Sequence, residues 1–335
     1  MIKLSNVDKY TEIPLILNEP YEKIEHEIEK NFSDSICFDD VIISRHPKKI
    51  KIWDIKKLPQ INMISSFEID WSGEFIKKNG NLLYVGQSKE IKVFDISDLQ
   101  HPVLVRTVTF PNDDSLPTNN YVNFHITKGL IYVMIDKAIY VIDETNNFLK
   151  IIDLSENSAM MFDYPMDIKK YGNNLYMVFR HCGLYVYQQS EHDRKYKFLS
   201  KHKPVNGYTP TYMQWLNQGN DILLIGNDNV VQYNVTNGEK LKRYKAAKIG
   251  KSEIHGGTIE RENELLVVGT KGSKDQFVTA IIQQDNKGIQ LVNTPKLEYK
   301  ARKKFGEGIS GLALKDNYLL IIGRETGFFL FEARE

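Results

Sequence analysis

Apolar and polar residues alternate in short runs along almost the whole chain. From residue 35 onward, runs of β-branched and aromatic residues such as NLLYVGQ (81–87) and EIKVFDI (90–96) are separated by Gly, Asn and Asp. Alternation with a period of two is typical of half-buried strands, and the residues between the runs are typical of tight turns. The pattern therefore predicts an all-β protein made of many short antiparallel strands.

The strand pattern also repeats. An apolar strand followed by a turn occurs seven times, from VIISRH (41–46) to NYLLIIGR (317–324), at intervals of about 41 to 54 residues, which is typical of propeller blades. We predict one domain over residues 1–335, a seven-bladed β-propeller of four-stranded antiparallel blades. Its blades are expected at approximately 35–69, 74–110, 121–155, 165–203, 209–247, 256–299 and 308–335. Six blades with a separate C-terminal hairpin form the less economical alternative.

The two chain ends are expected to meet in the last blade. The seventh repeat stops after its third strand, and residues 2–10 show strand-like alternation without a partner nearby. A strand at 2–10 that completes this blade would close the ring and remove its open edges. In the segment that follows, the apolar residues Tyr21, Ile24 and Ile28 lie on one stripe behind Pro20. This spacing predicts a short helix over 20–32 that covers an edge or opening of the propeller.

The second and first repeats resemble a known family. The segments NLLYVG (81–86), IKVFDISDL (91–99) and HPVLV (101–105) resemble the LVIVD repeat, and KIKIWDIKKLP (49–59) is similar to its central part. The resemblance implies a β-propeller, and the motif contains no catalytic residue. Asp54 and Asp95 are expected to cap the turn after the third strand. WD repeats are an adjacent possibility, but Trp53-Asp54 occurs once and the Gly-His partner is absent.

The composition is that of a globular protein without a membrane span. Of 335 residues, 41% are apolar and 26% are charged, and no run of about 18 apolar residues occurs. The N-terminus lacks the pattern of a secretory signal, and two cysteines are too few for a disulfide framework. We therefore expect a cytoplasmic protein. A net charge of +1 gives no general attraction to nucleic acid or membrane.

Charge is nevertheless distributed unevenly. Residues 1–40 are acidic, whereas segments 191–251 and 296–304 are basic and fall on the outer strands of predicted blades four to six. One interpretation is a positive rim that binds an acidic protein or peptide, or the helix 20–32 of a second copy. The other is a solvated edge on which lysines prevent strand pairing.

Candidate binding residues recur at one register of the repeat. An aromatic or imidazole side chain precedes five inner strands, and two Arg-His pairs occupy neighbouring loops. The ligand-binding set at the predicted channel mouth is Trp71, Tyr121, Tyr164, Tyr208 and His255 with Arg45, His46, Arg180 and His181. Recurrence also fits packing residues that seal the blade ends, so both interpretations stay open.

No motif assigns a reaction. A nucleophile elbow and a P-loop are both absent, and His46, His125, His181 and His255 come from different repeats without ligand spacing. We predict neither a metal nor a cofactor. The favoured hypothesis is a non-enzymatic binding or scaffolding propeller that recognises a protein, peptide or small polar ligand at the channel mouth. The alternative, based on the Arg-His pairs, is a hydrolase or lyase with a polar site in the channel, with or without an assisting metal.

Overall fold

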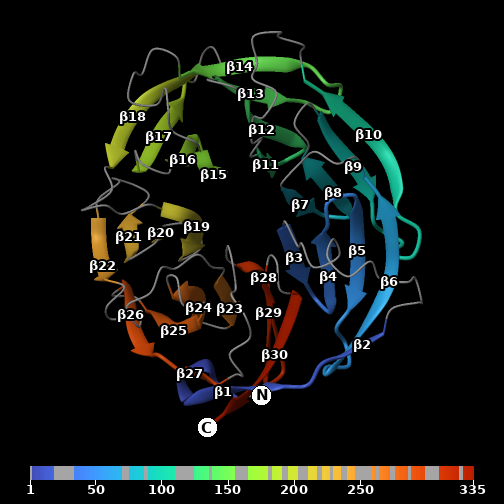
Figure 1. Ribbon diagram of the computed structural model, residues 1–335. Coiled ribbons are helices and arrows are strands. Elements are labelled where there is room, and N and C mark those ends of the chain that lie inside the picture. Colours follow the sequence, from blue (N-terminus) through green and yellow to red (C-terminus); the bar gives the residue numbers. More distant parts are fainter. Residues whose placement is uncertain are drawn as a thin grey trace.

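A ring of β-sheets surrounds a central axis in the computed structural model of the chain (Figure 1). The structure describes residues 2–18, 34–69, 75–86, 90–110, 124–135, 138–154, 165–179, 183–190, 195–202, 210–216, 221–226, 229–234, 240–245, 258–261, 264–271, 276–285, 288–298, 309–323 and 327–335. The predicted helix over 20–32 lies outside these residues.

Six sheets are each built on four strands that follow one another in the chain and pair antiparallel in that order. The first contains β3 (Asp34–Phe38), β4 (Val41–Arg45), β5 (Lys49–Asp54) and β6 (Gln60–Glu68). The second contains β7 (Ile76–Asn79), β8 (Leu82–Gly86), β9 (Glu90–Asp95) and β10 (Val103–Thr109). The third contains β11 (Phe124–Thr127), β12 (Leu130–Ile135), β13 (Ala138–Ile142) and β14 (Phe148–Asp153).

The next three sheets repeat this arrangement. The fourth contains β15 (Pro165–Tyr171), β16 (Asn174–Phe179), β17 (Gly183–Gln189) and β18 (Tyr196–His202). The fifth contains β19 (Pro210–Leu216), β20 (Asp221–Gly226), β21 (Asn229–Asn234) and β22 (Lys240–Lys245). The sixth contains β23 (Thr258–Arg261), β24 (Glu264–Lys271), β25 (Gln276–Asp285) and β26 (Gly288–Asn293). The protein is thus an all-β propeller with four-stranded antiparallel blades, as the strand pattern predicts.

One further sheet joins the two ends of the chain. Its consecutive strands are β28 (Ile309–Lys315), β29 (Tyr318–Gly323) and β30 (Gly327–Arg334), and its fourth is β1 (Lys9–Ile13), antiparallel to β30. The N-terminal strand therefore starts later than the predicted range 2–10. Residues Leu4–Asn6 form the 3₁₀ turn η1 instead. Leu4 and Val7 are buried to 1% exposure against the closing sheet, and a turn brings both into its core.

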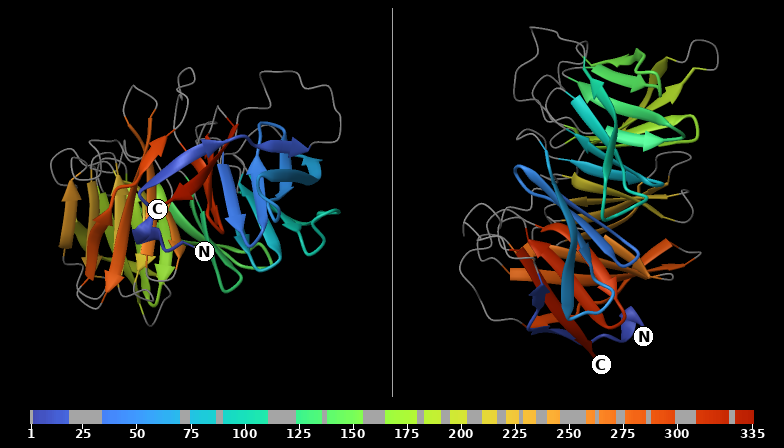
Figure 2. Two further views of the ribbon diagram at one scale, coloured as in Figure 1. Left: turned by 90° about the horizontal axis from the view of Figure 1, so that it is seen from below. Right: turned by 90° about the vertical axis from the view of Figure 1, so that its right-hand side faces the viewer.

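The N-terminal segment also pairs with strands that the repeat pattern does not predict. β1 lies parallel to β27 (Lys296–Glu298), which follows the sixth blade. Directly afterwards, β2 (Ile16–Asn18) lies parallel to β6 of the first blade. This segment consequently bridges the sixth blade, the closing sheet and the first blade, and both chain ends lie on the same side of the ring (Figures 1 and 2).

Short polar side chains form the turns after the third strands. Asp54 Oδ1 accepts a hydrogen bond of 2.7 Å from the Lys56 N–H, and Asp95 Oδ1 accepts one of 2.8 Å from the Ser97 N–H. In each case the carboxylate oxygen accepts from the amide two residues further along the chain, in place of a backbone carbonyl oxygen. This bond closes an Asx turn. The capping role expected for both aspartates is confirmed.

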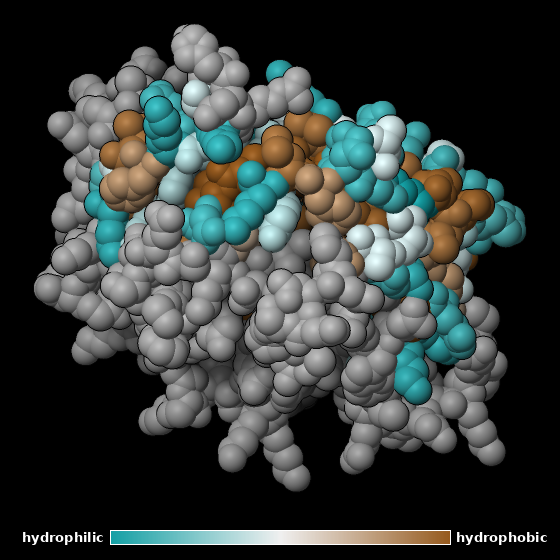
Figure 3. All heavy atoms as spheres, turned by 90° about the horizontal axis from the view of Figure 1, so that it is seen from above, coloured by the Kyte–Doolittle hydropathy of each residue, from teal (hydrophilic) through white to brown (hydrophobic). Residues whose placement is uncertain are grey.

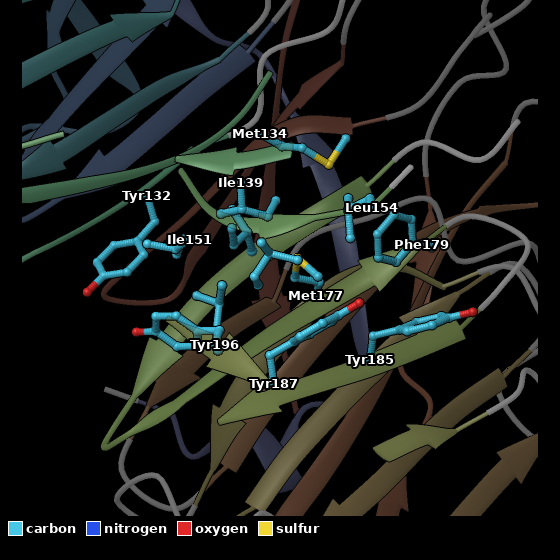
Figure 4. Packing of buried hydrophobic residues seen from close by; sticks show 13 residues of the cluster. Tyr132, Met134, Ile139, Ile151, Leu154, Met177, Phe179, Tyr185, Tyr187 and Tyr196 are labelled. Carbon is cyan, nitrogen blue, oxygen red and sulfur yellow. The ribbon is translucent and has the colours of Figure 1, made fainter. Parts of the chain in front are cut away.

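Apolar side chains from neighbouring blades interlock between the sheets. Between the third and fourth blades, Met134 and Ile139 meet Met177, Phe179 and other residues of one buried cluster (Figure 4). Phe179 and Tyr185 pack edge to face with ring centroids 5.2 Å apart, a favourable aromatic geometry. Because a blade packed in this way buries both faces, its middle strands, such as β16 and β17 of the fourth blade, consist mostly of buried residues.

The outer strands present both polar and apolar side chains to solvent. Large apolar side chains remain exposed there, and Figure 3 shows apolar surface between hydrophilic groups on the side of the ring that is uppermost in Figure 1. The exposed residues include Val103, Leu104 and Val105 of β10, Leu149 of β14 and Phe198 and Leu199 of β18. Blades diverge with distance from the axis, so neighbouring sheets no longer cover these side chains.

Candidate binding site on the inner wall

Most of the binding residues predicted from the sequence lie outside the described part of the chain. These are Trp71, Tyr121, Tyr164, Tyr208, His255, Arg180 and His181. The structure does place Arg45 and His46, at the end of β4. Both are buried, with exposures of 2% and 4%. Ser44 Oγ lies 3.0 Å from His46 Nε2 and accepts a hydrogen bond of 2.8 Å from Trp53 Nε1, so this histidine belongs to a polar chain inside the first blade.

The first strand of each sheet faces the axis of the ring (Figure 1). We call these strands the inner wall: β3, β7, β11, β15, β19, β23 and β28. Contacts link β28 to β3, β3 to β7, β7 to β11, β11 to β15, β15 to β19 and β23 to β28. Hydrogen bonds between blades reinforce some of these contacts. Asp34 Oδ2 on β3 accepts a bond of 2.8 Å from the Ile76 N–H on β7, and the hydroxyls of Ser35 and Ser310 lie 3.2 Å apart.

Four polar side chains on three adjacent inner strands form the inner cluster: Lys77 on β7, His125 on β11, and Asp167 and Lys169 on β15. Lys77 Nζ lies 3.7 Å from Asp167 Oδ1, and Lys169 Nζ lies 3.8 Å from Asp167 Oδ2. Since β11 stands between β7 and β15, the Lys77–Asp167 contact has to cross β11. The inner cluster therefore extends along the axial side of the wall rather than within one blade.

Burial and charge tune the groups of the inner cluster. The pKa of His125 falls from 6.5 to about 4, chiefly because burial disfavours the imidazolium and also because the Lys77 and Lys169 ammonium groups repel it; Asp167 opposes the change. His125 is consequently neutral at pH 7. Burial is also the main cause that lowers the pKa of Lys77, and Asp167 again acts in the opposite direction.

Lys77 and His125 have hydrogen-bonding capacity to spare. The Lys77 ammonium has three N–H donors, of which the contact with Asp167 takes up one. Within the described part of the chain, the His125 side chain forms no hydrogen bond. The Lys77 ammonium also lies 5.7 Å from the centroid of the Phe124 ring. By contrast, Lys169 donates to the carbonyl oxygen of Met213 on β19. An ammonium and a neutral imidazole on neighbouring strands are thus available to a ligand.

The exposed fractions show which groups a ligand would meet. The side chains of Lys77 and Lys169 are 27% and 17% exposed, whereas the Asp167 side chain is 9% exposed. Asp167 also accepts a hydrogen bond of 2.9 Å from the Ile168 N–H. The carboxylate therefore supports the two lysines from behind, and the cations are the more accessible partners. Such an arrangement binds negatively charged or strongly hydrogen-bond-accepting groups.

A metal centre does not emerge from the described residues, among which no three His, Cys, Asp or Glu side chains converge. Of the inner cluster, the sequence singled out His125 alone, as one of four histidines considered for a metal. Lys77, Asp167 and Lys169 could have been noticed in the sequences IKKN (76–79) and PMDIKKY (165–171), because these are first strands of the repeat that contain charged residues. Recognising them requires the knowledge that these strands face the axis.

Comparison with known proteins supports the fold. A family model described as the LVIVD repeat matches residues 76–109, the strands β7 to β10 of the second blade. The chain carries an LVIVD repeat. Together with the propeller architecture, this match confirms the resemblance read from the sequence. No curated protein matches the chain.

Solved structures with similar folds are remote in sequence. The crystal structure of the N-terminal domain of Nup159 has a TM-score of 0.56 and 10% identity, and covers 98% of this chain and 100% of that chain. Hsv2 of Kluyveromyces lactis has a TM-score of 0.54 and 13% identity, with coverage of 88% and 94%. A chain from the structure of S. cerevisiae Dbp5 bound to Nup159, Gle1, IP6 and ADP has a TM-score of 0.56 and 10% identity, with coverage of 98% and 95%. At these identities the likeness concerns the fold.

Proposed function

We propose that the chain is a binding or scaffolding propeller that holds a protein, peptide or small polar ligand against its inner wall, without catalysing a reaction. In this proposal the six consecutive blades and the closing sheet act as one seven-bladed ring. The observation that carries it is the inner cluster: on adjacent strands, Lys77 retains N–H donors beyond its contact with Asp167, and His125 forms no side-chain hydrogen bond within the described residues.

A protein partner receives support from the fold comparison. The N-terminal domain of Nup159 resembles this chain, and another similar chain comes from a structure of Dbp5 bound to Nup159. The predicted channel-mouth residues and the basic rim of blades four to six remain part of the proposal as additional contacts. Among the rim residues, Lys197 and Lys296 are exposed.

The alternative of a hydrolase or lyase depended on the Arg-His pairs. Arg45 and His46 are buried inside the first blade, and Arg180 and His181 lie outside the described residues. The described part of the structure thus gives this alternative no support.

Among the described residues, no helix is long and apolar enough to cross a bilayer. We retain a cytoplasmic location as part of the proposal, which the free thiol of Cys37 supports.

Hydrogen exchange can test where a partner binds. The full-length protein is used to capture partners, and amide exchange is then compared between the free protein and the purified complex. We expect slower exchange in β7, β11 and β15, with the outer strands β10, β14 and β18 of the same blades as internal controls. Protection confined to the outer strands, or failure to form any complex, would contradict binding at the inner wall.

A further inference from the structure

Charge and accessibility within the inner cluster indicate what kind of ligand would fit. An incoming group first meets the ammonium groups of Lys77 and Lys169, because Asp167 is the least exposed of the three. A positively charged ligand would be repelled by two cations before it reached the single carboxylate. An uncharged ligand would gain less from the two ammonium groups, because a hydrogen bond between two ionised groups is stronger than one to a neutral acceptor.

The hydrogen-bonding pattern narrows the class further. Lys77 presents N–H donors, and neutral His125 has one N–H donor on its ring. A carboxylate has two acceptor oxygens and can accept from both groups at once. Lys169, already donating to the Met213 carbonyl oxygen, would add charge. Carboxylates occur both on acidic side chains of proteins and on free small dicarboxylates.

We propose that the inner cluster binds a carboxylate group between Lys77 and His125, with Lys169 contributing its charge and Asp167 holding the two lysines in place. This inference rests on the proposed function, because it names the ligand chemistry of the same site. It adds that binding depends on charge and that Lys77 contributes more to affinity than its neighbours in sequence.

Two neighbouring lysines provide matched controls. Lys78 follows Lys77 on β7, yet its Nζ lies 4.3 Å from the centroid of the Phe38 ring. Lys170 follows Lys169 on β15, but its Nζ donates to the Gly172 carbonyl oxygen at 2.7 Å. Successive side chains of a strand point to opposite faces. Replacing Lys78 or Lys170 therefore changes net charge by the same amount without touching the inner cluster.

Affinity for simple carboxylates tests the proposal. Binding of a fluorescein-labelled glutamate pentapeptide to the full-length protein is measured by anisotropy at low salt, with the glutamine pentapeptide as the neutral control and succinate as a competitor. We expect the glutamate peptide or succinate to bind. Lys77→Gln should weaken this binding about tenfold or more, the effect of losing a charge-assisted hydrogen bond, whereas Lys78→Gln and Lys170→Gln should change it little.

A second pair of variants covers the possibility that Lys77→Gln does not fold. His125→Leu removes the donor, and His125→Gln restores one, so binding should weaken in the first and recover in the second. Competition by succinate would indicate a free dicarboxylate as a source, and binding of the peptide alone would indicate an acidic protein segment. The inference is overturned if neither probe binds, or if the Lys77 and Lys78 variants bind alike. Hydrogen-exchange protection of the inner wall by a partner would still stand in that case, so the two failures are distinguishable.

Discussion

The buried imidazole of His125 should make the stability of the propeller depend on pH. His125 has a pKa of about 4 in the folded protein, compared with 6.5 for the unperturbed side chain. Below pH 6.5 the unfolded chain therefore takes up a proton that the folded protein does not accept until the pH approaches 4. The free energy of unfolding consequently falls as the pH is lowered through this window.

The expected magnitude follows from the two pKa values. At about 1.4 kcal/mol per pH unit, the interval from 6.5 to about 4 corresponds to about 3 kcal/mol, most of which is lost by about pH 4.5. Replacing the side chain by an uncharged one abolishes this contribution. The difference in stability between His125→Gln and the wild type should thus shift by about 2 to 3 kcal/mol in favour of the variant between pH 7 and pH 4.5.

Urea unfolding of both proteins at the two pH values measures this shift. His101→Gln is the matched control, because the His101 side chain is 78% exposed and lies on a surface turn beside Asp98. The control should follow the wild type at both pH values. If His125→Gln also loses stability in parallel with the wild type, His125 is not held neutral by its surroundings, and the electrostatic description of the inner cluster is incorrect.

Three further changes probe the fold. Tyr10→Ala removes a fully buried ring from the closing strand and should cost about 3 to 5 kcal/mol in urea unfolding, whereas Leu17→Ala on β2, 43% exposed, should cost far less; equal costs would contradict closure by β1. Gly311→Ala places a Cβ 2.8 Å from Ser35 Cβ and should destabilise by about 1 to 3 kcal/mol, so an unchanged melting temperature would argue against close packing of β28 on β3. Burial raises the pKa of the Cys37 thiol to about 12, so a variant with Cys37 as its single cysteine should react slowly with iodoacetamide at pH 8 until urea unfolds it; rapid reaction of the native protein would contradict the raised pKa.

The sequence was informative wherever a structural feature is local. Strand alternation and turn residues locate the blades, and the Asp54 and Asp95 turns follow from side chains that bond amides two residues away. Closure was predictable in kind, because the last repeat lacks one strand. The register of β1 in the closing sheet was not predictable, because the placement of β1 depends on how Leu4 and Val7 reach the core of that sheet. The parallel additions β2 and β27 involve no local pattern at all.

The inner cluster illustrates a different limit. Lys77, His125 and Asp167 come from three separate repeats and meet through the curvature of the ring. In the sequence, each of these charged residues looks like any solvated lysine or aspartate. They can be recognised as a cluster only when the contact between Lys77 and Asp167 across β11 is known. Arg45 and His46 show the converse: a charged pair in a loop-like position of the sequence is buried within its own blade.

The binding of a carboxylate at the inner wall is tested most directly by the side-chain resonances of His125. Histidine-selective NMR can follow its ring during titration of the full-length protein with the glutamate pentapeptide at constant pH, while His101 reports on the surface. We predict that the His125 resonances move with saturation and that its pKa rises above about 4, because a bound carboxylate favours the imidazolium. Unchanged His125 resonances at peptide concentrations that saturate binding would contradict the proposal.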